Sequence, residues 1–165
     1  MDQTVRDCDR CHGTKADGAR CTRRTCKIGR FCFQHLSKEV GLAVRPSTIP
    51  GAGQGLFSTK VVSIPANKKR SGVPLIQYAG EQLTSAQHDA RYGDERGQYV
   101  LRLGPNRYID AKSTQSSVAR YANACDKPGA RKPCNAKFNN AGKLVAVKKL
   151  QKNQEILTRY GNDYF

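Results

Sequence analysis

Cysteines are concentrated at the start of this chain, and they limit how its first 40 residues can fold. Five of the seven cysteines lie within residues 8–32. The same segment has few large apolar residues, so burial alone gives it little folding free energy. Thiolate and imidazole side chains that bind zinc would supply the missing stability. We therefore predict a zinc-stabilised module over residues 1–38, with free thiols in a disordered basic arm as the alternative.

Ligand spacing supports the zinc interpretation. Cys8 and Cys11 are separated by two residues, and so are Cys32 and His35, which lets one tight turn present two ligands to the same ion. Residues 11–15, 18–21 and 32–35 resemble a small Cys/His module of proteins from large DNA viruses. The predicted ligands are Cys11, Cys32 and His35, with Cys21 or Cys26 as the fourth.

The chain is strongly basic. It carries 29 Lys and Arg against 13 Asp and Glu, a net charge of +16, with +4 in residues 1–40 and +12 in residues 41–165. A polyanionic partner such as DNA or RNA and a merely solvated basic surface both explain this charge. No apolar run reaches the ~20 residues that cross a membrane, and the N-terminus lacks a hydrophobic signal segment. We expect an intracellular protein that is neither secreted nor membrane-bound.

Residues 42–165 contain short apolar segments between frequent turn signals, which predicts a mainly β fold with few short helices. Predicted strands cover residues 61–64, 73–81, 99–103 and 107–110. A helix of about two turns is predicted over residues 84–92, with Thr84 as its N-cap and His88 on its surface.

Glycines alternate at positions 51, 53 and 55, just before Leu56 and Phe57. Such spacing permits positive φ and a close approach of the backbone to a ligand, although a plain hairpin turn is the more common explanation. The stretch is neither a phosphate-binding Walker loop nor a dinucleotide fingerprint, because no Gly-Lys-Ser/Thr follows and no βαβ pattern surrounds it.

Five segments follow one another in the order and spacing of a single family. They are residues 51–57, 77–81, 108–111, 120–125 with Asn135, and 155–161. With them the region 42–165 resembles a SET domain, the fold of protein-lysine methyltransferases. The resemblance implies several small β-sheets around a C-terminal pseudoknot, with S-adenosylmethionine and a substrate lysine entering a narrow channel from opposite faces.

The resemblance also implies roles for individual residues. Tyr160 and Tyr78 are implied in catalysis. The residues implied in cofactor binding are Ala52, Gly53, Gln54, Arg120, Tyr121, Asn123, Ala124, Tyr160 and Phe165, with Asn123 at the amino-acid end of the cofactor. The residues implied in the lysine channel are Tyr78, Phe138 and Thr158.

The chain departs from the family pattern after Asn123. Ala124 stands where the family has a histidine, and residues 126–133 are an insertion. Cys125 and Cys134 flank this insertion and are expected to be structural thiols.

The implied substrate is a basic protein, with a histone tail as the first candidate. Acidic residues in or beside the motifs are expected to attract it, and they are Glu81, Asp110, Glu155 and Asp163. The basic surface and the zinc module would then contact nucleosomal DNA, in the nucleus of a host cell or in association with a virion. The oligomeric state is open, a homodimer included. The alternatives are a nucleic-acid-binding zinc protein with an inactive SET-like domain and a methyltransferase for a non-histone protein.

Overall fold

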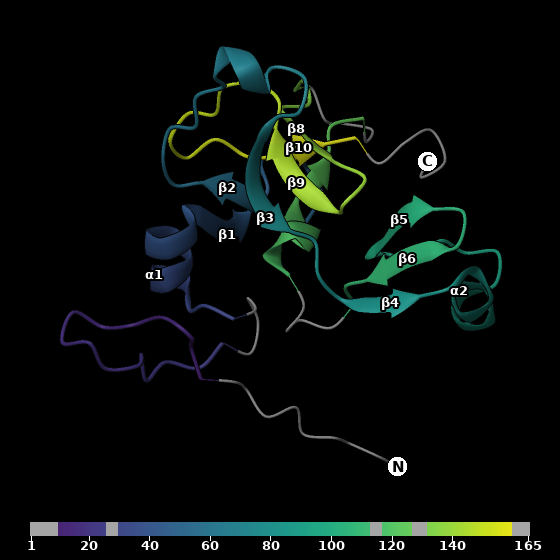
Figure 1. The fold of residues 1–165 in the computed structure, drawn as a ribbon, viewed down its shortest axis with the longest axis horizontal. Coiled ribbons are helices and arrows are strands. Elements are labelled where there is room, and N and C mark those ends of the chain that lie inside the picture. Colours follow the sequence, from purple (N-terminus) through teal and green to yellow (C-terminus); the bar gives the residue numbers. More distant parts are fainter. Residues whose placement is uncertain (1–9, 26–29, 113–116, 127–131, 160–165) are drawn as a thin grey trace.

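The computed structural model describes residues 10–25, 30–112, 117–126 and 132–159 (Figure 1). Short strands dominate it, which confirms the predicted mainly β class. The strands are β1 (Leu42–Pro46), β2 (Gln54–Ser58), β3 (Val73–Gln77), β4 (Glu81–Leu83), β5 (Val100–Gly104), β6 (Arg107–Asp110), β7 (Asn123–Ala124), β8 (Ala136–Phe138), β9 (Lys143–Ala146) and β10 (Leu157–Thr158). The helical segments are α1 (Phe33–His35), η1 (Leu36–Val40), η2 (Ala66–Lys68), α2 (Ser85–Tyr92) and η3 (Val118–Tyr121).

Strands β1 and β2 form an antiparallel hairpin, with Leu42 opposite Ser58 and Pro46 opposite Gln54. The glycine-rich stretch is the connection between them. Gly51 and Gly53 have φ of 72° and 68°, a backbone conformation that favours glycine. The hairpin interpretation of this stretch is therefore confirmed.

Two three-stranded antiparallel sheets make up most of the remaining β structure. One has the order β3–β9–β8 and the other the order β4–β6–β5. Figure 1 shows the second sheet, with α2 beside it, standing apart from the group formed by β1, β2, β3, β8 and β9. The chain passes from one sheet to the other between β3 and β4, where a single predicted strand over 73–81 is divided in two.

Helix α2 is confirmed together with its cap. The Thr84 side chain accepts a hydrogen bond from the Gln87 backbone, and the Gln87 side chain accepts one from the Thr84 backbone, which is a reciprocal capping box. The prediction that His88 lies on the surface is wrong. His88 is only 8% exposed because its ring stacks on Tyr108 of β6, with the centroids 4.5 Å apart.

Strands β7 and β10 pair in parallel, with Leu157 opposite Asn123 and Thr158 opposite Ala124. A parallel pair needs a long crossover between its strands, and here the crossover contains β8 and β9. Cys125 and Cys134 lie at the two ends of the predicted insertion and are joined in a disulfide. The expectation of structural thiols is therefore corrected to a disulfide, because pairing to β10 on both sides brings the two ends of the insertion together.

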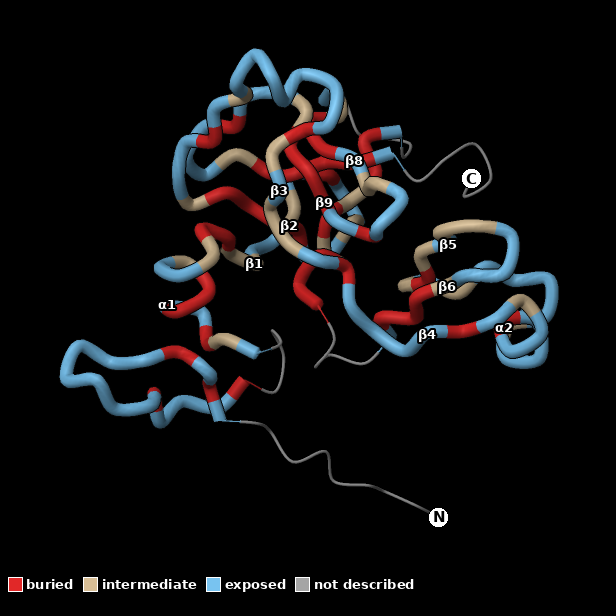
Figure 2. Tube along the Cα trace, viewed as in Figure 1, coloured by how far each residue is buried: buried red, intermediate tan, exposed pale blue. Residues whose placement is uncertain are grey.

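The main core is formed largely by buried residues of the β1–β2 hairpin and the β3–β9–β8 sheet (Figure 2). Leu56, Leu144, Leu150 and Ile156 are fully buried there. Leu36, from the predicted zinc module, packs into the same core, so this module is connected to the rest of the fold by apolar contact. A smaller cluster around Tyr78 and Ile109 lies toward the second sheet.

The predicted strand over residues 61–64 is wrong. Only Val62 makes a bridge, to Leu150, and Pro65 follows soon after and cannot donate to a ladder. None of the helices in the described ranges has the length and apolar character needed to cross a membrane.

Candidate functional site

Cys11, Cys21, Cys32 and His35 form a buried cluster in the N-terminal segment. Their ligand atoms all lie within 4.8 Å of one another. His35 Nδ1 is 3.5 Å from Cys11 Sγ and 3.3 Å from Cys32 Sγ. Tetrahedral zinc with bonds of about 2.0–2.3 Å holds its ligand atoms roughly 3.3–3.8 Å apart, and the two distances from His35 Nδ1 lie in this range. These four residues are together and can bind a metal.

Hydrogen bonds prepare the cluster for a cation. The Nε2 of His35 lies 2.9 Å from the Thr14 carbonyl oxygen, so this nitrogen carries the proton and Nδ1 is left as the ligand. Backbone N–H groups of Gly13 and Cys32 donate to Cys11 Sγ. Burial raises the pKa of Cys32, but the hydrogen bond from the His35 backbone and the contacts with the His35 and Cys11 side chains outweigh it and lower the pKa to about 6. A thiolate, the form that binds metal, is thereby favoured.

One of the two candidates for the fourth ligand is present in this cluster. Cys21 lies in the cluster, whereas Cys26 is outside the described residues. Gly13 packs so closely on the His35 ring that an added Cβ would lie 2.2 Å from it. Glycine at position 13 is therefore part of how the cluster is built.

Glu155 is the centre of a second buried cluster, in the body of the fold. It is only 4% exposed, and its carboxylate accepts hydrogen bonds from the Ser47 hydroxyl at 2.6 Å and from the Thr48 backbone at 2.9 Å. The Thr48 hydroxyl also donates to it. Burial raises the pKa of Glu155, but these donors outweigh it and hold the pKa below its usual range. The carboxylate is thus ionised and ties the hairpin loop to the C-terminal segment.

Asn123 joins the same cluster from β7. Its Nδ2 donates to the Gln54 carbonyl oxygen at 2.9 Å and to Glu155 Oε1 at 3.3 Å. Gly55 allows this approach, because an added Cβ would lie 2.4 Å from Glu155 Oε1. Buried Asn135 makes a comparable link, since its side chain donates to the Glu155 carbonyl and accepts from the Leu157 N–H. Three predicted motif segments therefore meet around one carboxylate.

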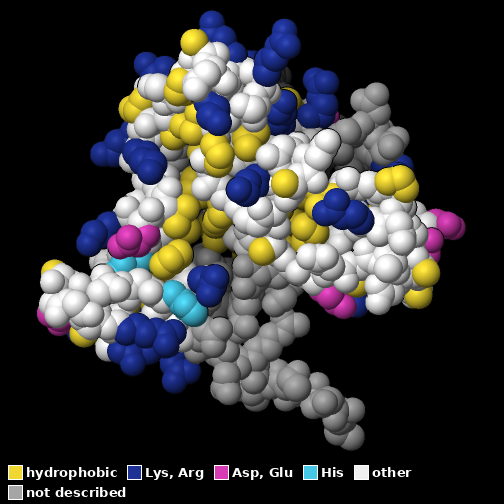
Figure 3. Space-filling view, viewed as in Figure 1, with side chains coloured by type: hydrophobic (Ala, Val, Ile, Leu, Met, Phe, Trp, Pro, Cys, Tyr) yellow, Lys and Arg dark blue, Asp and Glu magenta, His cyan; other side chains and the backbone are white. Residues whose placement is uncertain are grey.

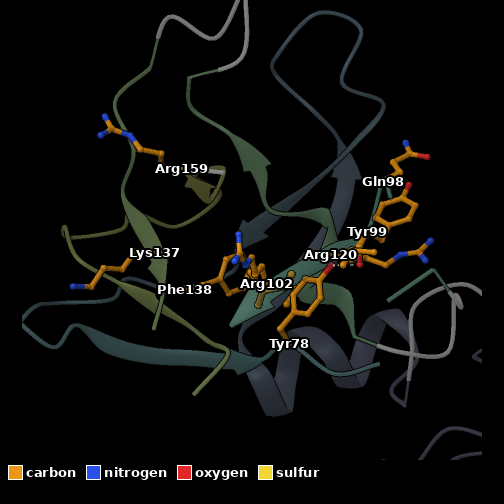
Figure 4. Close-up of a pocket in the computed structure, with 11 residues that line it drawn as sticks. Tyr78, Gln98, Tyr99, Arg102, Arg120, Lys137, Phe138 and Arg159 are labelled. Carbon is orange, nitrogen blue, oxygen red and sulfur yellow. Dashed lines mark hydrogen bonds between the residues drawn. The ribbon is translucent and has the colours of Figure 1, made fainter. Parts of the chain in front are cut away.

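A cavity of about 360 Å³ lies between the two three-stranded sheets (Figure 4). Tyr78 and Phe138, both predicted for the lysine channel, line it and meet edge to face with their ring centroids 5.2 Å apart. The Tyr78 hydroxyl donates to the Tyr99 carbonyl at 2.8 Å. The full lining is Tyr78, Gln98, Tyr99, Val100, Leu101, Arg102, Ala119, Arg120, Lys137, Phe138 and Arg159.

Arg120 lies on the inner side of this cavity. Its guanidinium is 4.3 Å from the centroid of Tyr99 and 4.9 Å from that of Tyr121, which is a double cation–π contact. One terminal nitrogen donates to the carbonyls of Ala111 and Lys112. The buried Nε has no hydrogen-bond partner within the described part of the chain. An unpartnered donor at this depth is expected where a ligand completes the site.

The remaining predicted site residues lie in several places. Ala52 and Gly53 are in the hairpin loop, and Ala124 is buried opposite Thr158. Thr158 is fully buried and does not line the cavity, and its hydroxyl lacks a partner among the described residues. Tyr160, Asp163 and Phe165 lie outside the described residues.

Of the four acidic residues expected to attract a basic peptide, Asp110 and Glu155 are buried, whereas Glu81 is exposed and paired with Arg91. Asp110 is buried and accepts from Arg91 Nη1 at 2.9 Å, and Glu81 forms two hydrogen bonds with the same guanidinium. Burial raises the pKa of Asp110, but its donors, Tyr92 first among them, outweigh it and lower the pKa. Glu155 is buried as described above, so these carboxylates stabilise the fold.

Sequence reasoning missed Glu155 as a centre of hydrogen bonding and missed most of the cavity lining. The signal available for Glu155 was an acidic residue directly before the apolar pair Ile156 and Leu157. Tyr99, Arg102, Lys137 and Arg159 had no sequence signal, because only the packing of two sheets brings them together.

No protein-family model matches this chain, and no curated protein matches it either.

Proposed function

We propose that this protein is an S-adenosylmethionine-dependent protein-lysine methyltransferase with a zinc-stabilised N-terminal module. The observation that carries the proposal is the convergence on Glu155. The hairpin loop, β7 and β10 contain three of the motif segments that resemble a SET domain, and hydrogen bonds of Glu155, Asn123 and Asn135 join them. If these motif segments form one binding site, they are expected to lie together in the fold.

Residues suited to hold the cofactor are present. The loop backbone at Gly51 and Gly53 is exposed, with open space where a Cβ would be. Asn123 stands beside this loop through its bond to Gln54, and Arg120 contributes an unpartnered buried donor. S-adenosylmethionine supplies an activated methyl group when bound. In this proposal Asn123 holds its amino-acid end, and Tyr160 orients the reacting methyl.

The cavity is suited to the lysine. Methyl transfer needs a neutral amine, whereas free lysine has a pKa near ~10.4. A desolvating channel lined by Tyr78, Val100, Leu101 and Phe138 disfavours the ammonium form, and so does every neighbouring cation. Alignment of the amine with the methyl group then provides much of the acceleration. The substrate is a protein lysine, in a histone tail or in a non-histone protein, and the site of action is the nucleus of a host cell or a virion.

Calorimetry with S-adenosylmethionine tests the proposal. We expect binding to the native chain and a large loss of affinity in Asn123→Ala. Tyr160→Phe is expected to lower turnover strongly while it leaves cofactor affinity nearly unchanged. No binding by the native chain would remove the enzyme hypothesis, and equal loss of affinity and turnover in Tyr160→Phe would make Tyr160 a structural residue.

A second candidate function, nucleic-acid binding by the zinc module, is favoured by one observation. Phe33 is 64% exposed, and the Arg23 guanidinium lies 5.2 Å from its ring centroid. Beside it runs a groove of about 650 Å³ whose lining includes Lys38 and Arg45. In the view of Figure 3, Lys and Arg side chains are more frequent on the molecule's surface than Asp and Glu. An exposed ring beside cations is the arrangement on which unpaired bases stack.

Fluorescence anisotropy with a labelled single-stranded oligonucleotide tests this candidate. Loss of one stacked base costs about 1–3 kcal/mol, so Phe33→Ala is expected to weaken binding by roughly 5- to 150-fold. Val61 is the other exposed large apolar residue of the described chain, at 53%, and Val61→Ala is the control. Equal affinities for the two variants would show that Phe33 stacks no base.

A further inference from the structure

We propose that the cavity between the two sheets accepts a lysine flanked by acidic residues, and that it disfavours a lysine in a basic segment such as a histone tail. This inference rests on the proposed methyltransferase function and names its class of substrate. It starts from the charge of the lining. Arg102, Arg120, Lys137 and Arg159 line the cavity, and no Asp or Glu belongs to the described lining.

The cations divide by depth. Arg120 is half-buried and engaged by carbonyls and rings, while Arg102, Lys137 and Arg159 are exposed. Figure 4 shows Lys137 and Arg159 on one side of the cavity and Gln98 and Tyr99 on the other. The apolar and aromatic interior of the cavity suits the aliphatic part of a lysine side chain. The cationic rim suits carboxylates of the residues that flank this lysine in the peptide.

Neighbouring groups leave this positive charge largely uncompensated. Lys137 donates to the Arg70 carbonyl, which carries no net charge. Arg159 has an ion pair with Asp126 at 3.8 Å, but its side chain is 70% exposed, so solvent screens the pair. The acidic residues expected nearby, Glu81 and Asp110, are held by Arg91 on the second sheet. The rim therefore repels a basic segment and attracts an acidic one.

The same charge assists the chemistry. Cations near an amine disfavour its protonated form, so a positive rim lowers the pKa of the bound lysine toward the neutral state that accepts a methyl group. In a basic peptide the flanking residues would meet this rim with like charge. An acidic peptide gains attraction at the rim while its lysine still enters an environment that favours the neutral amine.

Binding and methyl transfer are to be measured separately with three peptides of equal length, in which one central lysine has acidic, neutral or basic flanks. Binding is measured by fluorescence anisotropy on versions with norleucine at the lysine position, so that it does not depend on catalysis. Transfer is measured with labelled S-adenosylmethionine on the lysine versions. We expect the acidic peptide to bind at least tenfold more tightly than the basic one, with a difference that shrinks as salt rises.

Charge variants test the rim directly. Each exposed ion pair changes a binding constant by a factor of about 1.4–5. The double variant Lys137→Gln with Arg159→Gln is therefore expected to weaken binding of the acidic peptide by roughly tenfold. The affinity for the neutral peptide should change by less than twofold in this variant. Lys149→Gln with Lys152→Gln removes the same charge from exposed positions outside the cavity and serves as the matched control, with a change below twofold for every peptide.

The outcomes separate the inference from the function on which it rests. Methylation of the basic peptide with equal or better binding would overturn the inference and leave the methyltransferase standing. Binding of the acidic peptide with no transfer to any peptide would support the acidic occupant and refute the enzyme. Loss of oligonucleotide binding in the rim variants, with no acidic peptide bound, would assign the cavity to nucleic acid and overturn the inference.

Discussion

At the scale of single residues, Glu155 stands out because its carboxylate joins segments that are remote in sequence. Its hydrogen bond with Ser47 spans 108 positions, and the one with Asn123 spans 32. A buried carboxylate is costly unless donors surround it, and here four donors do so. Ionisation of this group is therefore coupled to folding.

Glu155→Gln is expected to lower the free energy of unfolding by about 1–3 kcal/mol at pH 7, because the amide NH₂ faces groups that are themselves donors. The measurement is urea denaturation, with exposed Glu95→Gln as the control. The pKa of Glu155 is depressed in the fold, so the stabilisation is present above the unfolded pKa of ~4.3 and is lost as pH falls through the folded pKa. The difference in unfolding free energy between the native protein and Glu155→Gln should thus narrow below about pH 4. A difference that stays constant with pH would contradict the assigned role of the Glu155 carboxylate.

Gly55→Ala tests the close approach to the same carboxylate. The added methyl would lie 2.4 Å from Glu155 Oε1, and overpacking of this kind costs about 1–3 kcal/mol. We expect the thermal midpoint to fall by several degrees. Gly104→Ala is the control, because a Cβ there meets no atom within 4 Å. Equal thermal midpoints for the two variants would show that the Glu155 cluster accommodates the added methyl group without loss of stability.

At the scale of elements, the N-terminal segment depends on its ligands for structure. Besides Leu36, which packs into the main core, its buried apolar residues are mainly the cysteines themselves. Side chains of Arg10 and Arg20 donate to backbone carbonyls across the segment, yet these bonds are largely exposed and contribute little alone. Metal binding is therefore expected to be the main source of its stability.

Cys21→Ser is expected to abolish stoichiometric zinc, measured as release to a chromophoric chelator, and the native chain is expected to release one ion. Exposed His12 stands outside the cluster, so His12→Ala should keep the metal. Amide hydrogen exchange should show loss of protection in residues 10–25 after chelation, with β9 still protected. Absence of zinc from the native chain, or its retention in Cys21→Ser, would refute the assignment.

At the scale of the whole molecule, a net charge of +16 on 165 residues opposes compaction through self-repulsion. Basic side chains are scattered over the surface shown in Figure 3, and few ion pairs offset them among the described residues. Screening by salt shortens the range of this repulsion from about 30 Å at 0.01 M to about 8 Å at 0.15 M.

The thermal midpoint is accordingly expected to rise by a few degrees between 0.01 M and 0.15 M sodium chloride. Lys149→Gln with Lys152→Gln should reduce this rise, because both positions are exposed and the substitution removes two like charges. A midpoint that falls with salt would mean that local ion pairs, such as Arg91 with Glu81 and Asp110, outweigh the net repulsion.

Features that depend on local chemistry could be predicted from the amino-acid sequence. The mainly β class follows from short apolar runs and turns, α2 follows from its capping box, and the grouping of Cys11, Cys32 and His35 follows from ligand spacing. Each of these features depends on residues close together in sequence or on the fixed coordination geometry of a single ion.

Other features could not be predicted from the sequence, because they arise from contacts between segments that are distant along the chain. His88 is buried because β6 packs on α2, and Glu81 and Asp110 both pair with Arg91. The positive rim of the cavity exists because two sheets bring Arg102 and Lys137 to one opening. Charge counted along a chain does not show which charges meet; the packing of the sheets decides that.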